Sequence, residues 1–109
     1  MCRRAQGAAF VTWVGAAESS FALLTGTDQL KRFQSSAAAV RTFCSNCGTP
    51  LFFQSTRWPG QIHVTLASLE SSDGLEPQAH VHWSSRAPWA DWSGHELPKL
   101  EPEGQPDRD

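Results

Sequence analysis

Short alternating apolar runs, separated by turn residues, constrain the fold of this chain most strongly. The clearest run is 61–66, in which Ile62, Val64 and Leu66 share one side and polar residues face the other. This is the two-residue period of a half-buried β-strand. Five more runs of four to six residues lie between turn residues: 10–15, 21–24, 30–34, 39–43 and 50–54. Runs of this length and spacing predict a mainly β domain.

Two segments depart from the strand pattern. Residues 2–8 have the Arg, Ala and Gln content of a short helix, which Gly7 is expected to end within about two turns. Residues 84–92 carry a proline and are rich in tryptophan, so we expect a fixed loop packed on the domain rather than a strand. Trp89 and Trp92 could line a ligand pocket, but a small domain short of aliphatic residues favours them as core.

The length of 109 residues allows one domain with one modest core. Only 39% of the residues are hydrophobic, but six Phe and five Trp supply much apolar area per side chain. The core is expected to include Phe10, Trp13, Phe43, Leu51, Phe53, Ile62, Val64 and Leu66. No large apolar residue follows Leu100, so we predict a domain over 1–100 and a disordered tail over 101–109.

The charge composition and the apolar pattern exclude some partners. The net charge is −2, with only two lysines, which gives no basic face for a phosphate backbone, so nucleic acid is not an expected partner. No apolar run approaches the roughly 20 residues of a membrane-spanning helix, and we expect no membrane association. The charged start 1–4 and the apolar stretch 8–17 loosely resemble a secretory signal, but Thr12 and Trp13 interrupt that pattern. The odd number of cysteines, three, favours a reducing compartment, and we expect a cytoplasmic protein.

The most informative motif is a Cys-x-x-Cys pair followed by glycine, at Cys44, Cys47 and Gly48, between two predicted strands. Two thiolates at this spacing converge on one metal ion, and the glycine lets the backbone turn back, as in a zinc knuckle. A redox dithiol would need a helix that starts at the first cysteine, and Gly48 and Pro50 disfavour that helix. Metal binding is therefore the favoured interpretation, with a redox pair or inert packing as alternatives.

The four histidines are weaker candidates for metal binding. His80 and His82 lie one residue apart on a predicted strand, so both would point to the same side, a geometry that can bind a metal ion. A polar strand face is the favoured alternative for this pair. His63 and His95 are interpreted as solvated or hydrogen-bonded side chains without a ligand role.

Three stretches together resemble the glutathione-dependent formaldehyde-activating enzyme family and its centromere-protein-V-like relatives. They are MCRRAQGAAF at 1–10, FCSNCGTPL at 43–51 and HVHWSSRAPW at 80–89. The resemblance covers nearly all of the chain up to about Leu100. It implies an Mss4-like β fold, here a single domain with a zinc-knuckle turn and one short N-terminal helix.

The resemblance also implies ligand roles. In that family an N-terminal Cys-x-Cys joins the later Cys-x-x-Cys in a structural four-cysteine zinc site, and a separate cysteine-rich motif holds a catalytic zinc. Matched residue by residue, Cys44 and Cys47 are the later half of the structural site, and Cys2 is the last ligand of the catalytic one. Arg3 and Arg4 would pair with glutathione carboxylates, with a solvated cationic edge as the alternative. The earlier ligands of both sites have no counterpart here, which we interpret as an N-terminal truncation.

The function implied is that of a zinc-dependent carbon–sulfur lyase that forms S-hydroxymethylglutathione or a related thiol adduct. Its ligand would be glutathione or another small thiol or aldehyde adduct. Loss of the upstream cysteines would make this enzyme inactive in its shortened form. The alternative is a non-enzymatic zinc-binding or protein-binding module that keeps the same fold.

The ligand count sets an expectation for metal content. A structural zinc with a full ligand set contributes on the order of 10 kcal/mol to folding, whereas two thiolates leave the tetrahedron incomplete. We therefore expect well under one equivalent of zinc per chain. The exception would be a homodimer in which Cys44 and Cys47 of two copies complete one four-thiolate site.

Overall fold

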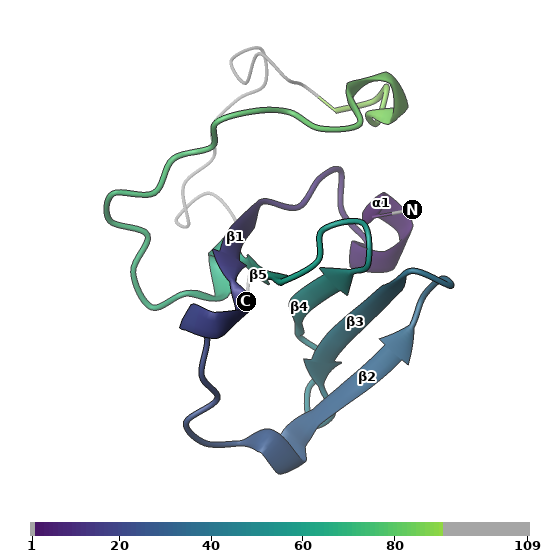
Figure 1. The fold of residues 1–109 in the computed structure, drawn as a ribbon. Helices are drawn as coiled ribbons and strands as arrows, with labels where there is room; N and C mark the ends of the chain where they lie inside the picture. The colour runs from purple at the N-terminus through teal and green to yellow at the C-terminus, as the bar shows by residue number, and fades with distance from the viewer. Residues whose placement is uncertain (1, 91–109) are drawn as a thin grey trace, which may run out of the picture.

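The computed structural model describes residues 2–90, and its regular structure is mostly strand. One short helix precedes the sheet: α1 (Cys2–Gln6). The strands are β1 (Trp13–Ala17), β2 (Leu30–Gln34), β3 (Ala39–Cys44), β4 (Pro50–Ser55) and β5 (Gln61–Thr65). The connecting 3-10 turns are η1 (Glu18–Ser20), η2 (Thr27–Gln29), η3 (Leu66–Ser68) and η4 (Trp83–Ser85). The prediction of a mainly β domain with one short N-terminal helix is confirmed (Figure 1).

The five strands form one antiparallel sheet in the order β1-β5-β4-β3-β2. Strands β2 to β5 follow one another as a meander, and β1 pairs with β5 at the edge opposite β2 (Figure 1). The connection over 18–29 therefore joins the two edges of the sheet. The prediction of a strand over 21–24 is wrong because these residues belong to that connection. Phe21 packs edge-on against Phe52, with 5.1 Å between ring centroids, and Leu24 is 90% exposed.

The other strands predicted within 10–66 are confirmed, and four of them agree with the structure to within one residue at each end. The first strand begins at Trp13 rather than at Phe10. The last hydrogen bond at this end of the β1–β5 pair runs from the Leu66 N–H to the Thr12 carbonyl, at 2.9 Å. Phe10 lies before that point and is 61% exposed. The alternation therefore locates a strand better than it locates the strand's first residue.

Cross-strand pairing lines up an aromatic row on one face of the sheet. Phe33, Arg41, Phe53 and His63 are successive partners across β2, β3, β4 and β5. The Phe53 ring lies 5.8 Å from the ring of Trp13 and 6.0 Å from that of His63, centroid to centroid. The Arg41 guanidinium carbon lies 5.3 Å from the Phe53 centroid, a cation–π distance. Aromatic contacts between strands thus supply packing that a small aliphatic content cannot.

The hydrophobic core is thin. Ile62 is 5% exposed and Ala39 is 7% exposed, and no large side chain in the described part of the chain is completely buried. Ile62 is the one predicted core residue that is buried, and Phe10 is wrong as a core residue because it lies outside the sheet and is exposed. The remaining predicted core residues are half-buried: Trp13, Phe43, Leu51, Phe53, Val64 and Leu66.

The chain leaves the sheet after η3. The predicted strand over 80–83 is wrong because His82 has φ +55°, a left-handed conformation that ends an extended run. His80 and His82 therefore do not form a same-side pair on a strand. Trp89 is 70% exposed, so the prediction that it belongs to the core is also wrong. Four further predictions lie outside the described residues: those for Trp92, for His95, for the boundary at Leu100 and for the tail over 101–109. No helix within 2–90 is long and apolar enough to cross a bilayer.

Candidate functional site

The Cys-x-x-Cys motif forms the turn between β3 and β4, as predicted from its spacing. The Gly48 N–H donates to the Cys44 carbonyl at 2.7 Å, and the Cys44 N–H donates to the Thr49 carbonyl at 2.9 Å. Gly48 has φ +81°, a conformation in which a residue with a Cβ is strained. This closed turn brings the thiols of Cys44 and Cys47 within hydrogen-bonding range of each other.

The segment that crosses to β2 also fixes this turn. The Ser45 N–H and the Ser45 hydroxyl both donate to the carbonyl of Gln29, at 2.7 Å and 2.9 Å. Gln29 is the last residue of η2, immediately before β2. The two thiols therefore lie on a backbone that is held by its own hairpin and by a neighbouring segment.

Thr49 adjusts the electrostatics of the turn. Its hydroxyl lies 3.0 Å from the Cys47 sulfur. The hydrogen bond from the Thr49 side chain, followed by those from the Thr49 backbone and the Cys44 side chain, lowers the pKa of the Cys47 thiol below its ordinary value of 9.0. The side chain of Cys47 is exposed, so burial opposes this shift only weakly. The sequence analysis did not single out Thr49, although a hydroxyl two residues after the second cysteine of the motif is a recognisable signal.

The described residues do not complete a zinc site. Tetrahedral zinc takes four protein ligands in structural sites, and the turn provides two thiols, Cys44 and Cys47. Across residues 2–90, no three His, Cys, Asp or Glu side chains lie close enough together to hold one metal ion. The turn therefore has the chemistry of half a structural zinc site, and no reaction step is assigned to a metal here.

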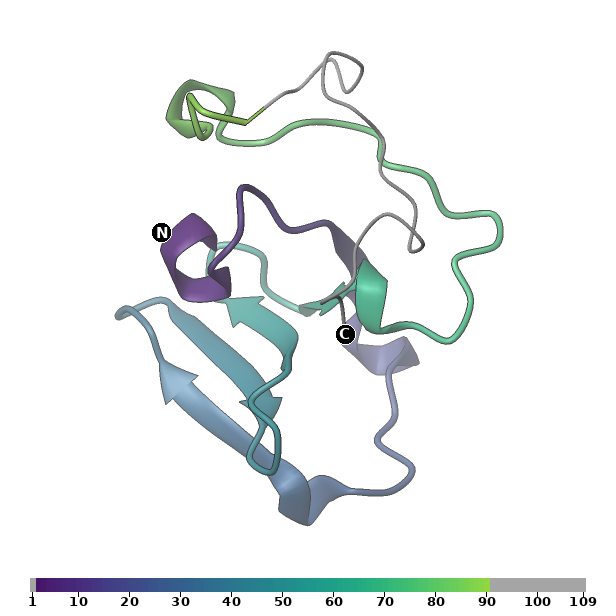
Figure 2. The same ribbon diagram turned by 180° about the vertical axis from the view of Figure 1, so that it is seen from behind.

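The helix that carries Cys2, Arg3 and Arg4 lies at the opposite end of β3 and β4 from the thiol turn. Figure 1 and Figure 2 both show α1 beside the β2–β3 connection and the end of β4, whereas the turn lies beside η2. Six-residue strands separate their ends by about 17 Å at the rise of extended backbone. The backbone thus places Cys2 far from Cys44 and Cys47. Arg4 is exposed.

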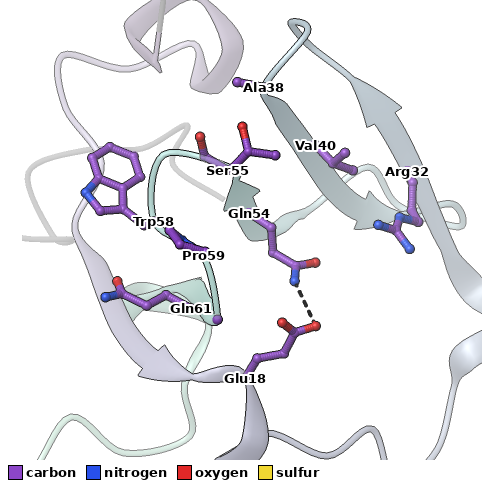
Figure 3. Close-up of a pocket in the computed structure, with 11 residues that line it drawn as sticks. Glu18, Arg32, Ala38, Val40, Gln54, Ser55, Trp58, Pro59 and Gln61 are labelled. Atoms are coloured by element: carbon purple, nitrogen blue, oxygen red, sulfur yellow. Dashed lines mark hydrogen bonds between the residues drawn. The ribbon is translucent and has the colours of Figure 1, made fainter.

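A shallow pocket of about 290 Å³ lies on the sheet, with Glu18 and Arg32 among its lining residues (Figure 3). The Gln54 side-chain amide donates to a carboxylate oxygen of Glu18, at 3.4 Å. The pocket also includes Ala38 and Ser55, at the end of the strands where α1 lies (Figure 3). Sequence reasoning missed this pocket because its walls come from β2, β3, β4, β5 and three connections, and only the sheet order brings these together.

His63 lies in the aromatic row. Its ring is 5.7 Å from that of Trp58 and 6.0 Å from that of Phe53, centroid to centroid. Its Nδ1 atom is buried and has no hydrogen-bond partner among the groups that the structure describes. Gly15 leaves room for this ring, since a Cβ at Gly15 would lie 3.4 Å from it. The surroundings of His63 are those of a packed side chain rather than of a solvated one.

The stretch around Trp83 contains a cluster of three side chains, His80, Trp83 and Arg86. The His80 ring lies 4.9 Å from the Trp83 ring, and the Arg86 guanidinium lies 4.2 Å from that ring on a cation–π contact. Arg86 Nη1 also donates to the Trp83 carbonyl at 2.9 Å. All three side chains are exposed, and none of them is brought to the thiol turn.

Comparison with known proteins supports one assignment. The family model described as glutathione-dependent formaldehyde-activating enzyme matches residues 1–85, a span that includes α1, the whole sheet and the thiol turn. Neither the curated proteins nor the solved structures contain a match to this chain. Because the family model covers most of the chain, the chain belongs to the glutathione-dependent formaldehyde-activating enzyme family.

Proposed function

We propose that this chain is a glutathione-adduct enzyme of the carbon–sulfur lyase type. Its reaction would be the reversible formation of S-hydroxymethylglutathione or of a related thiol adduct. The observation that carries the proposal is the family match over 1–85, which spans both the Cys-x-x-Cys turn and the helix with Cys2. An Mss4-like arrangement of the sheet is part of the same proposal.

Adduct formation requires little from a protein beyond binding of the substrates and control of proton transfer. The glutathione thiolate adds to the carbonyl carbon of formaldehyde, so that a carbon–sulfur bond forms and the carbonyl oxygen becomes a hydroxyl. The proton that leaves sulfur balances the one that oxygen gains. Cations on α1 can hold the peptide's carboxylates, and Arg4 is exposed there. Arg3 and Arg4 are therefore the proposed glutathione-binding residues.

Zinc is the proposed cofactor, with Cys2 as a ligand at the reactive site and Cys44 and Cys47 as structural ligands. The thiol turn supports the structural assignment because it pairs the half-buried thiol of Cys44 with the exposed thiol of Cys47, and such a pair suits a soft, thiolate-binding metal. A zinc bound near α1 would supply the means of lowering the pKa of a substrate thiol. Cytoplasmic location belongs to this proposal too, since free thiols persist in a reducing compartment.

A second candidate function is supported by one specific observation. No group of three metal-binding side chains is formed within the described residues, so that part of the chain does not by itself make a complete reactive metal site. A zinc-binding or protein-binding module with the same fold needs only the thiol turn and the sheet. The two functions differ in whether glutathione and formaldehyde react faster in the presence of the protein.

The test is an exchange experiment on a reaction that also proceeds without catalyst. Two-dimensional exchange NMR on glutathione and formaldehyde gives the adduct-formation rate with and without the zinc-treated chain. The enzyme proposal expects a rate above background that falls to background in Cys2→Ser. Arg4→Ala should raise the KM for glutathione by up to about fivefold, the effect of one exposed charge pair. Lys31→Ala, which removes an exposed cation from β2, is the matched control. A rate equal to background in all proteins supports the module instead.

A further inference from the structure

We infer that the pocket lined by Glu18 and Arg32 is a binding site for an α-amino carboxylate, a group with an ammonium and a carboxylate on one carbon atom. Glu18 would bind the ammonium, and Arg32 would bind the carboxylate. A free amino acid and the γ-glutamyl end of glutathione both present this group. The inference does not rest on the proposed function, because it concerns binding at this pocket and not adduct formation.

The size and the lining of the pocket suit a small ligand. Its volume of about 290 Å³ lies near the lower end of the range for small-molecule pockets. The apolar part of the lining includes Val40, Trp58 and Pro59. The charged lining residues are Glu18 and Arg32. Apolar walls with a few convergent polar groups are the usual composition of a site that orients a small molecule.

The two charges of the pocket have opposite signs and do not neutralise each other. The Glu18 carboxylate accepts a hydrogen bond from the Gln54 side-chain amide, at 3.4 Å. No carboxylate among the described residues lies within ion-pair distance of Arg32. A zwitterionic ligand supplies a partner for each charge, since its carboxylate can pair with the forked guanidinium and its ammonium with the carboxylate.

The order of the strands sets the spacing of these charged groups. Gln54, which binds Glu18, lies in β4, and Arg32 lies in β2, so β3 separates their strands by about 10 Å. An ammonium and a carboxylate on one carbon, with a hydrogen bond at each end, span about 8–9 Å. Figure 3 shows Gln54 between Trp58 and Arg32, with the Glu18 carboxylate next to its amide. The spacing of the polar groups is therefore comparable with the length of this ligand group.

Backbone hydrogen bonds fix the walls of the pocket. The Glu18 N–H donates to the Gly60 carbonyl at 2.8 Å, which holds η1 to the β4–β5 connection. The Thr56 N–H donates to the Ala38 carbonyl at 2.9 Å, which joins the same connection to the β2–β3 connection. A site whose walls are already held together loses less conformational entropy when a ligand binds.

The experiment titrates the reduced, chelated 109-residue chain with L-alanine and follows its backbone amides by two-dimensional ¹⁵N NMR. The amides of the lining residues Gln54, Trp58 and Gln61 should shift in a saturable way, with a Kd on the order of 1 mM. N-acetyl-L-alanine has no ammonium, and L-alaninamide has no carboxylate. Each should bind about fivefold more weakly, the effect of one exposed charge pair.

Single substitutions assign each charge of the ligand to one side chain. Arg32→Ala should weaken L-alanine about fivefold and leave the affinity for L-alaninamide unchanged. Glu18→Gln should weaken L-alanine by a similar factor and leave the affinity for N-acetyl-L-alanine unchanged. Lys31→Ala and Glu70→Gln, which remove exposed charges outside the pocket, are the matched controls. Circular dichroism checks that each variant keeps its β spectrum.

Reduced glutathione in place of L-alanine distinguishes the two sources of the ligand group. A Kd at least about tenfold lower than that of L-alanine, and raised by Arg32→Ala, identifies the γ-glutamyl end of the peptide, whereas a similar or higher Kd identifies a free amino acid.

Three outcomes overturn the inference. They are no saturable shift of the lining amides at about ten times the expected Kd, equal binding of L-alanine and its two singly charged derivatives, and an Arg32→Ala chain that binds L-alanine as the unmodified chain does. Because the readout is binding, its failure is distinguishable from a failure to accelerate adduct formation.

Discussion

The sheet and the segment that follows it differ in where their hydrogen bonds go. From Trp13 to Thr65 each strand is paired with at least one other strand, through hairpins such as Gln34 with Val40 and through the distant pair of Trp13 with Thr65. From Leu69 to Ala90 the backbone hydrogen bonds that the structure contains are local, such as Leu75 N–H to the Ser72 carbonyl. In this segment every residue except Ala87 and Ala90 is exposed.

The residues that the family model matches extend beyond the residues that form the paired sheet. The family match extends through residue 85, so it includes the His80–Trp83 stretch as well as the sheet. Among the described residues, the strand pairing lies in the sheet, and so does the buried side chain of Ile62, whereas Ala87 is buried in the segment. The strand pairing that stabilises the described fold therefore lies within 13–65, and the backbone hydrogen bonds described for the segment beyond it are local.

Amide hydrogen exchange should give the largest contrast between the two regions. Amides of β3, β4 and β5 open only with the whole sheet, while those of 69–90 need only local fluctuations. We expect the sheet amides to be protected on the order of 10³-fold more than those of the segment, from a global stability of at least about 5 kcal/mol. Mass spectrometry of peptides from both regions measures the ratio. Equal protection of the sheet amides and of the amides in 69–90 would contradict the difference between the two regions.

Aliphatic truncation is the next test of the comparison. Ile62→Ala removes buried methyl groups from β5 and should lower the free energy of unfolding by about 2–4 kcal/mol. Val81 is 77% exposed in the segment, and Val81→Ala should cost less than about 0.5 kcal/mol. Urea denaturation followed by tryptophan fluorescence compares the two. A cost at Val81 near that at Ile62 would mean that the segment packs on the sheet.

Two glycines with a left-handed backbone conformation provide a further comparison of the two regions. Gly48 in the thiol turn has φ +81° and Gly74 has φ +79°, and a Cβ at either position meets nothing within 4 Å. Gly48→Ala should therefore cost about 1–2 kcal/mol through backbone strain alone. Gly74→Ala should cost a few tenths of that in global stability, because the segment can rearrange without opening the sheet. Thermal denaturation of both variants measures the difference, and equal costs would contradict local relaxation in the segment.

The smallest expected effect is electrostatic. It tests whether the thiol turn between β3 and β4 is held as firmly as the strands of the sheet. Because the pKa of Cys47 is lowered first by the Thr49 side chain, Thr49→Val should move the midpoint of its alkylation rate to higher pH. The depressed pKa stabilises the folded state above the ordinary value of 9.0, and this contribution is lost as the pH falls through the lowered value. Iodoacetamide labelling of the reduced, chelated chain measures the midpoint, with Ser45→Ala as the control. An unchanged midpoint in Thr49→Val would show that the turn is not held in this geometry.

The features that could be predicted from the sequence are those that depend on residues close together in the chain. The two-residue period located β2 to β5, and the glycine after Cys47 located the turn, because both signals act over a few positions. The segment 21–24 and the stretch 80–83 have a local composition like that of the strands, but neither pairs with a strand among the described residues. The neighbouring residues in the sequence do not reveal this difference. The same holds for the pocket, whose lining residues Glu18 and Arg32 come to one pocket only through the order of strands in the sheet. The assignment of Cys2 to a separate site from Cys44 and Cys47 stays a prediction, to which the structure adds their placement at opposite ends of the strands.

X-ray absorption at the zinc edge tests the central claim most directly, namely that the turn at one end of the sheet holds zinc through Cys44 and Cys47. On the zinc-saturated, reduced Cys2→Ser chain, which leaves Cys44 and Cys47 as its cysteines, the account predicts a first shell that includes sulfur at about 2.3 Å. The sulfur scattering should be lost when Cys44 and Cys47 are also replaced by Ser. A first shell of nitrogen and oxygen alone, at about 2.0–2.1 Å, would contradict the account.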